Sequence, residues 1–159
     1  MKRAHKLLGI TAVLAVVFAA AVSAHHSFAM YDQNKTVTIT GVVKQFVPQA
    51  NHAEFHVYLL APDRKGIEKG KDGKYVEWGV ELAGTAQLER QGVTAASYPP
   101  NVTVISIKVN PLRDGSNYGA RAGALAKCPM ESPTKPKLPE AGKHCDSVAG
   151  RTLVGGDTF

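Results

Sequence analysis

The chain has 159 residues, 44% of them hydrophobic, and a formal net charge of +6 with its histidines neutral. These values fit one domain with a buried core. Without Lys2, Arg3 and Lys6, the 19 basic residues become 19 − 3 = 16 against 13 acidic ones, a net charge of +3. Basicity therefore gives no argument for a nucleic-acid partner.

The first 24 residues are predicted to be a cleaved signal peptide. Lys2, Arg3 and Lys6 form a positive start, residues 7–21 are an apolar run, and Val22-Ser23-Ala24 offers small residues for cleavage. An uncleaved anchor is the weaker alternative, because the run is short of the ~20 apolar residues that span a bilayer. Cleavage leaves 159 − 24 = 135 residues, predicted to be periplasmic or secreted and without a membrane span.

Cleavage after Ala24 would make His25 and His26 the first two residues. A free α-amine, two imidazoles and a deprotonatable backbone amide would then lie within one residue of each other. Such a nitrogen-rich set suits Cu(II) or Ni(II). Free amines and imidazoles have pKa values of about 8 and about 6.5, so we expect binding at neutral pH that weakens toward pH 5.

Residues 25–34 have no clear period and are predicted to form an N-terminal arm, with Phe28 and Tyr31 as anchors. Residues 35–46 alternate and predict a half-buried strand, with a bulge or bend at Gly41. Its two faces carry Val37, Ile39 and Val43 on one side and Thr36, Thr38 and Thr40 on the other.

Residues 53–60 and 74–82 predict two more strands, joined by a long connection rich in glycine and charge over residues 61–73. One face of the first strand carries Phe55, Val57 and Leu59, and the other carries His52, Glu54, His56 and Tyr58. In the second strand, Val76, Trp78, Val80 and Leu82 oppose Tyr75, Glu77 and Glu81. Two histidines and a carboxylate therefore share one strand face, and Trp78 is predicted to be a core residue.

Gly84 to Gly92 predicts a short helix with Thr85 as its N-cap and Gly92 as its stop. Residues 101–109 predict a largely apolar strand, and residues 118–125 a weaker one. Three strands, a short helix and two strands match the element order of a five-stranded OB-like Greek-key barrel, which we expect over residues 35–125. Residues 126–159 are predicted to be an irregular C-terminal excursion that ends in a last short strand at residues 151–154.

Cys128 and Cys145 are the only cysteines. In an exported chain the pair favours a disulfide, which would contribute ~3 kcal/mol by constraining the unfolded chain. A metal clip is the alternative, because His144 adjoins Cys145 and Met130 lies two residues past Cys128. The disulfide is preferred, since exported thiols oxidise and no second C-x-x-C pair exists.

Several short motifs together resemble an uncharacterised family of small exported bacterial proteins, a domain of unknown function. They are A-H-H-S-F from Ala24, N-H-A at Asn51 to Ala53, W-x-V-E-L at Trp78 to Leu82, L-x-R-x-G at Leu88 to Gly92 and D-G-S-N at Asp114 to Asn117. The resemblance covers residues 24–125, with a weaker echo at Gly150 to Leu153, and implies an exported barrel without an activity. The family's usual N-P-H-A lacks its proline here, the cysteine-bearing excursion looks like an insertion, and His56 is particular to this chain.

Two ligand sets are open for a copper ion. In one, the amine and ring of His25 are joined by His52 or His56. In the other, the His25 amine, the His26 amide and the His26 ring bind locally. Glu54 or Glu81 would orient a ligating ring from behind.

Two further functions remain open. The alternative to metal binding is a module that holds a small envelope molecule or an envelope protein on its barrel face, with Tyr58, Tyr75 and Tyr118 as contacts. A copper-dependent oxidase is disfavoured, because the sequence shows no substrate groove and a ligand set alone is not an active site. A G-x-S-x-G motif and a glycine-rich phosphate loop are absent from the sequence, so nothing points to a hydrolase or a nucleotide-binding enzyme.

Overall fold

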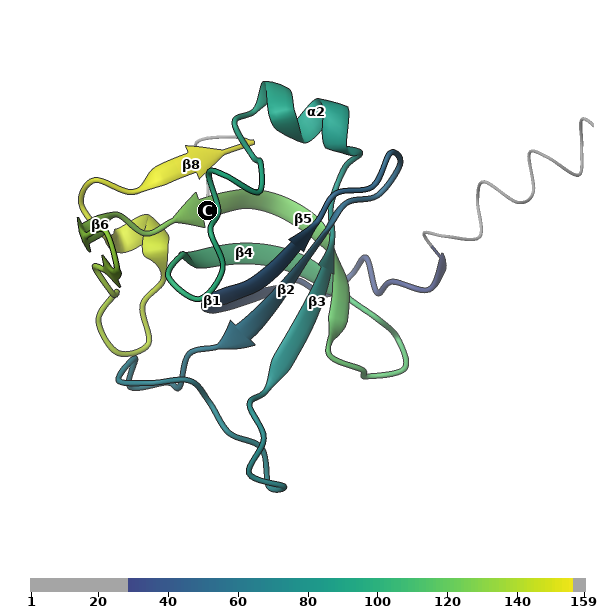
Figure 1. Ribbon diagram of the computed structural model, residues 1–159. Coiled ribbons are helices and arrows are strands. Elements are labelled where there is room, and N and C mark those ends of the chain that lie inside the picture. The colour runs from purple at the N-terminus through teal and green to yellow at the C-terminus, as the bar shows by residue number, and fades with distance from the viewer. Residues whose placement is uncertain (1–28, 156–159) are drawn as a thin grey trace, which may run out of the picture. The chain divides into compact units, whose positions relative to one another are not determined.

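The computed structural model describes residues 29–155 (Figure 1). A compact unit begins at Asp32, and the residues up to Tyr31 belong to a separate unit. The predicted signal peptide at residues 1–24, together with His25, His26 and Phe28, lies outside the described residues. Across residues 29–155, no helix combines the length and hydropathy that crossing a bilayer requires.

Five strands close into a barrel (Figure 1). They are β1 (Val37–Val47), β2 (Glu54–Leu59), β3 (Glu77–Glu81), β4 (Val104–Pro111) and β5 (Tyr118–Lys127). Antiparallel pairs join β1 to β2 and β4, β2 to β3, and β4 to β5, while a parallel pair between β3 and β5 closes the ring. The predicted five-stranded OB-like barrel is confirmed.

The inward side chains of the strands form one apolar core, which Leu88 of the helix α2 (Thr85–Arg90) joins. Its fully buried members include Val43, Phe55, Val57, Val80, Leu88, Ile105, Ile107, Val109 and Leu125. Alternation along the sequence identified most of these positions, because side chains of a strand point to its two faces in turn. Trp78 packs against this core and stays partly exposed.

The bulge in β1 lies at Lys44, so the prediction of a bulge at Gly41 is wrong. The pairing with β2 shifts between Val43 and Gln45, which leaves Lys44 as the extra residue. Gly41 has a different role, because a Cβ there would collide with the Tyr58 carbonyl of β2. Glycine at this position lets β1 and β2 approach closely.

The predicted N-cap of α2 is also wrong. Gly84, in an extended conformation, takes the N-cap position, and the Thr85 hydroxyl donates to the Gln49 carbonyl at 2.7 Å. Thr85 is thus the first helical residue, and no side-chain hydrogen bond caps the start of α2. Gly92 does end the segment, with a φ of +76° that favours glycine.

The C-terminal excursion, here residues 128–151, is fastened to the barrel by a disulfide between Cys128 and Cys145. The predicted disulfide is confirmed, and both sulfurs are thereby unavailable for a metal clip. The excursion contains the short strands β6 (Met130–Ser132) and β7 (Lys135–Pro136) and the 3-10 helix η1 (Cys145–Ser147). The strand β8 (Thr152–Val154) follows and pairs with β5, as the sequence predicts for a last short strand.

Candidate functional site

The outer face of β2 and β3 carries the polar side chains that alternation predicts there. Phe55 and Val57 are fully buried toward the core, so Glu54 and His56 point outward and are half-buried. On β3, the half-buried Glu77 and Glu81 share one face with Gly79, and Trp78 and Val80 point to the other. The sheet therefore places histidine and carboxylate side chains on one open surface.

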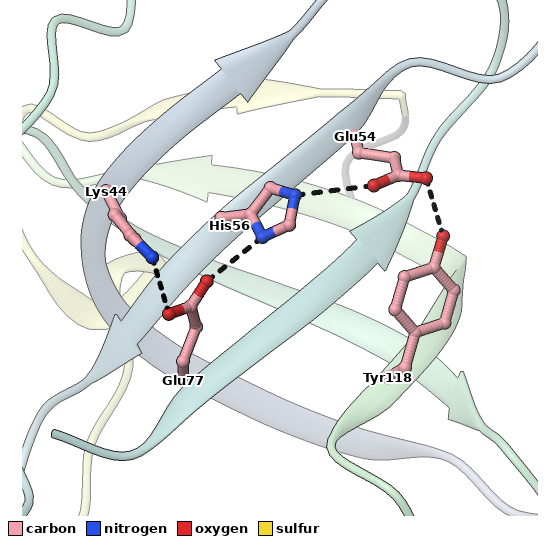
Figure 2. Close-up of polar contacts among 5 residues, drawn as sticks. All are labelled: Lys44, Glu54, His56, Glu77 and Tyr118. Carbon is pink, nitrogen blue, oxygen red and sulfur yellow. Dashed lines mark hydrogen bonds and ion pairs between the residues drawn. The ribbon is translucent and has the colours of Figure 1, made fainter. Parts of the chain in front are cut away.

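Three of these side chains form a continuous chain of contacts with Lys44 of β1 and Tyr118 of β5, and the five together are named here the polar row (Figure 2). Lys44 Nζ lies 2.7 Å from Glu77 Oε2, and the other oxygen of Glu77 lies 3.0 Å from His56 Nδ1. His56 Nε2 lies 3.4 Å from Glu54 Oε2, and the Tyr118 hydroxyl donates to Glu54 Oε1 at 2.9 Å. The row runs across β1, β3, β2 and β5.

Strand register and the β1 bulge bring the first three members of the row together. Tyr58 is paired with Glu77 and His56 with Gly79, so Glu77 and His56 are diagonal neighbours within reach of each other. Lys44 is the extra residue of the bulge, and a bulge redirects the side chain that it carries. Its ammonium can therefore reach past β2 to Glu77.

Gly79 makes room for the last member of the row. The parallel pairing of β3 and β5 sets Gly79 beside Tyr118. A Cβ on residue 79 would collide with the Tyr118 ring. The missing side chain thus lets the ring lie across β3, with its hydroxyl on Glu54.

A second histidine–carboxylate pair lies just ahead of β2. Nδ1 of His52 is 3.2 Å from Oε1 of Glu81. Ala53 fixes the backbone here, since it accepts from the Leu82 N–H at 2.8 Å and donates to the Ala83 carbonyl at 3.2 Å. The His52 side chain is 52% exposed, and within residues 29–155 no hydrogen bond or ion pair involves its Nε2.

The two carboxylates at the centre of this face oppose each other. Glu54 and Glu81 are direct partners in the register of β2 and β3. Like charges directly opposite each other destabilise a sheet. Glu81 meets His52, and Glu54 meets His56 and Tyr118, so each carboxylate is offset by a proton donor or a cation. The face is built to hold positive charge against its carboxylates.

Neighbouring groups also shift the pKa of Glu77, the second member of the row. Burial raises the pKa of Glu77, but the hydrogen bonds from Lys44 and His56 outweigh it and hold that pKa below its ordinary value. The pKa of Lys44 is raised in turn, mainly by its hydrogen bond to Glu77. Glu77 is therefore ionised at neutral pH and anchors His56 from Nδ1.

Among the predicted metal ligands, His25 and His26 lie outside the described residues. Within the described part, no group of three or more histidine, cysteine, aspartate or glutamate side chains has a metal-binding arrangement. His52 and His56 lie about 13 Å apart along an extended chain, and each binds its own carboxylate. Glu81 contacts the ring of His52 and Glu54 contacts the ring of His56, whereas Glu77 and Lys44 were not predicted for the site.

The three tyrosines predicted as ligand contacts separate into two places. Tyr58 and Tyr75 line one groove beside the polar row, and their ring centroids lie 5.4 Å apart. Tyr118 belongs to the polar row itself. The groove and the row meet at Glu77, which takes part in both.

Comparison with known proteins gives a family and a distant structural likeness. A family model described as "Family of unknown function (DUF6152)" matches residues 12–121. A search of the curated proteins finds no match. Among solved structures, the mitochondrial single-stranded DNA binding protein Rim1 of S. cerevisiae is similar with a TM-score of 0.36 and 8% identity, over 55% of this chain and 87% of that one.

Proposed function

The chain belongs to this family of unknown function, which brings no activity with it, and we propose from the residues themselves that the protein is exported and binds a transition-metal ion, copper first. His25 and His26 enter the proposal from the sequence. His52 and its carboxylate partner enter from the geometry of the barrel face.

The contact between His52 and Glu81 carries the proposal. A carboxylate on Nδ1 fixes the tautomer and direction of an imidazole and raises its basicity, as it does behind many metal-bound histidines. The opposite nitrogen, Nε2, is then the atom with a lone pair to give, and the ring is half-exposed. The pair also joins two motifs of the family resemblance, N-H-A and W-x-V-E-L, which lie 81 − 52 = 29 positions apart in the sequence.

His56 is the less suitable ligand of the two barrel histidines. Both of its ring nitrogens face carboxylates, Nδ1 at 3.0 Å and Nε2 at 3.4 Å. A metal at Nε2 would have to displace or recruit Glu54, which already accepts from Tyr118. His56 therefore serves as the matched control for His52, since the two differ in surroundings and not in chemistry.

Titration of the mature chain, beginning at His25, with Cu(II) tests the proposal. We expect saturable binding, seen as a d-d absorption band, that disappears in the double variant His25→Ala, His26→Ala, because His25→Ala alone keeps the amine, amide and ring of the local set. Glu81→Gln should weaken a site that uses His52 by roughly tenfold or more, because the ring loses its orientation. A His52→Ala variant with full affinity would assign the ion to the local chelate of His25 and His26.

Absence of saturable binding to the mature chain would refute the metal proposal. The export proposal has its own measurement, the intact mass and cell fraction of the native product. A mass that begins at His25 in the periplasm or medium supports export, and a chain that keeps residues 1–24 contradicts it.

The second candidate function is a module that binds a small envelope molecule or a protein partner without metal. The observation in its favour is the groove of Tyr58 and Tyr75, which is lined by none of the four histidines predicted as metal ligands. Binding that persists unchanged in His25→Ala and His52→Ala would support this candidate.

A further inference from the structure

The groove beside the polar row has a volume of about 510 Å³. It lies between β2, β3 and the connection that joins them, and is lined by Tyr58, Lys69, Gly73, Lys74, Tyr75 and Glu77. The connection is held in place by a β-bridge between Lys69 and Tyr75 and by the Gly70 N–H, which donates to the Lys74 carbonyl at 2.8 Å. The volume of the groove falls within the range of small-molecule sites.

Two tyrosine rings give the groove its aromatic walls. The rings of Tyr58 and Tyr75 are tilted by 60° at a centroid distance of 5.4 Å, so a flat ring can stack on one and meet the edge of the other. Tyr75 is 50% exposed, although it is among the larger hydrophobic side chains. A ligand that covers this ring would remove apolar surface from water.

Lysines surround these rings. Lys44 Nζ lies 5.3 Å from the Tyr58 ring centroid, and Lys69 Nζ lies 5.8 Å from the Tyr75 ring centroid. Lys74, which also lines the groove, has Asp72 within 3.6 Å.

The one lining carboxylate is already neutralised, since Glu77 binds Lys44 and His56. Lys69 makes no ion pair with any described residue. The groove thus presents an uncompensated ammonium beside exposed aromatic surface, which favours a ligand anion and repels a cation.

We propose that this groove binds a flat organic anion of the aromatic carboxylate class. The ligand ring stacks on the exposed ring of Tyr75 and meets the edge of Tyr58, and the ligand carboxylate pairs with Lys69. This deepens the second candidate function by naming its ligand class, and it is independent of the metal proposal because no predicted metal ligand lines the groove.

The test uses 4-hydroxybenzoate, the neutral benzamide and the cation benzamidine as probes, each titrated into the ¹⁵N-labelled mature protein at low salt. We expect saturable shifts at residues 58 and 75 and an affinity for 4-hydroxybenzoate about tenfold or more above that for benzamidine. Adding salt should weaken binding of the acid, since the groove lysines are exposed.

Three variants separate the contributions. Tyr75→Ala, at an exposed position, should weaken all ring-containing probes by about tenfold. Lys69→Met should weaken the acid alone and leave benzamide unchanged. Lys71→Met removes the same charge from the same connection outside the groove, and should leave every affinity unchanged.

Three results would overturn the proposal. They are equal affinities for the acid and benzamidine, no effect of Tyr75→Ala, or glucuronate, an anion without an aromatic ring, binding as tightly as 4-hydroxybenzoate. Repeating the titrations in His25→Ala and His52→Ala keeps the outcomes apart, because those variants test the metal proposal and leave the groove intact.

Discussion

The outer surface of the barrel is open over β2 and β3 and covered over β1 and β4, and a histidine lies on each side. On the open side, His56 stands between the carboxylates of Glu54 and Glu77. On the covered side, His144 of the excursion contacts the hydroxyl of the buried Thr40 through Nδ1 at 2.6 Å. The same residue type thus meets anions in one place and neutral hydroxyls in the other.

The covered side keeps its histidine neutral. Burial lowers the pKa of His144, and the charge of Arg64 adds to this against the opposing effect of Asp146. Thr40 also contacts Ser106 at 2.7 Å, and Ser106 accepts from the Cys145 N–H at 2.8 Å. The three side chains form one chain of hydrogen bonds, Ser106 to Thr40 to His144, whose direction follows the tautomer of the neutral ring. The open side instead places its histidines against carboxylates.

The largest expected effect comes from removing the disulfide, which should destabilise the protein through the covered side and leave the structure of the open side unchanged. In the double variant Cys128→Ala, Cys145→Ala, we expect the free energy of unfolding to fall by ~3 kcal/mol and the melting temperature by roughly 10 °C, because the unfolded chain loses its constraint. Thermal unfolding followed by circular dichroism measures this. Reductant should reproduce the loss in the wild type and do nothing further to the variant, while the amide shifts of Glu54 and His56 stay in place. Unchanged melting would contradict the role given to the disulfide.

Acid should destabilise the covered side through His144. Its pKa is lowered on folding, so the unfolded chain takes up a proton at a higher pH than the folded one. The contribution of the neutral ring to stability is complete above the ordinary value of 6.5 and is lost as the pH falls through the lowered value.

The variant His144→Gln isolates that contribution, since it keeps an acceptor for Thr40 and cannot titrate. Urea unfolding between pH 7.5 and pH 5 should show a smaller decline in stability for the variant than for the wild type. If the free energy of unfolding falls with pH equally in the two proteins, the pKa of His144 is not changed by folding.

The alternation of apolar residues and the number of cysteines were sufficient to predict much of the structure on both the covered and the open side. Buried Phe55 and Val57 fixed which side of β2 faces outward, and the two cysteines predicted the disulfide. Thr40 was placed on an outward face, and its burial follows only from the excursion that covers it. A strand pattern tells which face a residue takes, and it does not tell what lies over that face.

The polar row shows the other limit of the sequence. Glu77 was assigned to the same face as Glu81, but its contact with His56 depends on strand register, which pairing partners determine. The sequence placed the bulge at Gly41, and its position at Lys44 is what directs that ammonium to Glu77. Contacts between separate strands therefore stayed unpredicted even where each strand was found.

The smallest expected effect comes from Lys44→Met on the open side. Stability should change little, because the Lys44 and Glu77 side chains are 39% and 33% exposed and such ion pairs are weak. The pKa of Glu77 should rise, since the hydrogen bond from Lys44 helps to hold it down. Carboxyl NMR titration measures this, with Lys65→Met as a control that removes the same charge away from any described ion pair. An unmoved Glu77 titration would mean that His56 alone sets it, and that the open side does not depend on the bulge at Lys44.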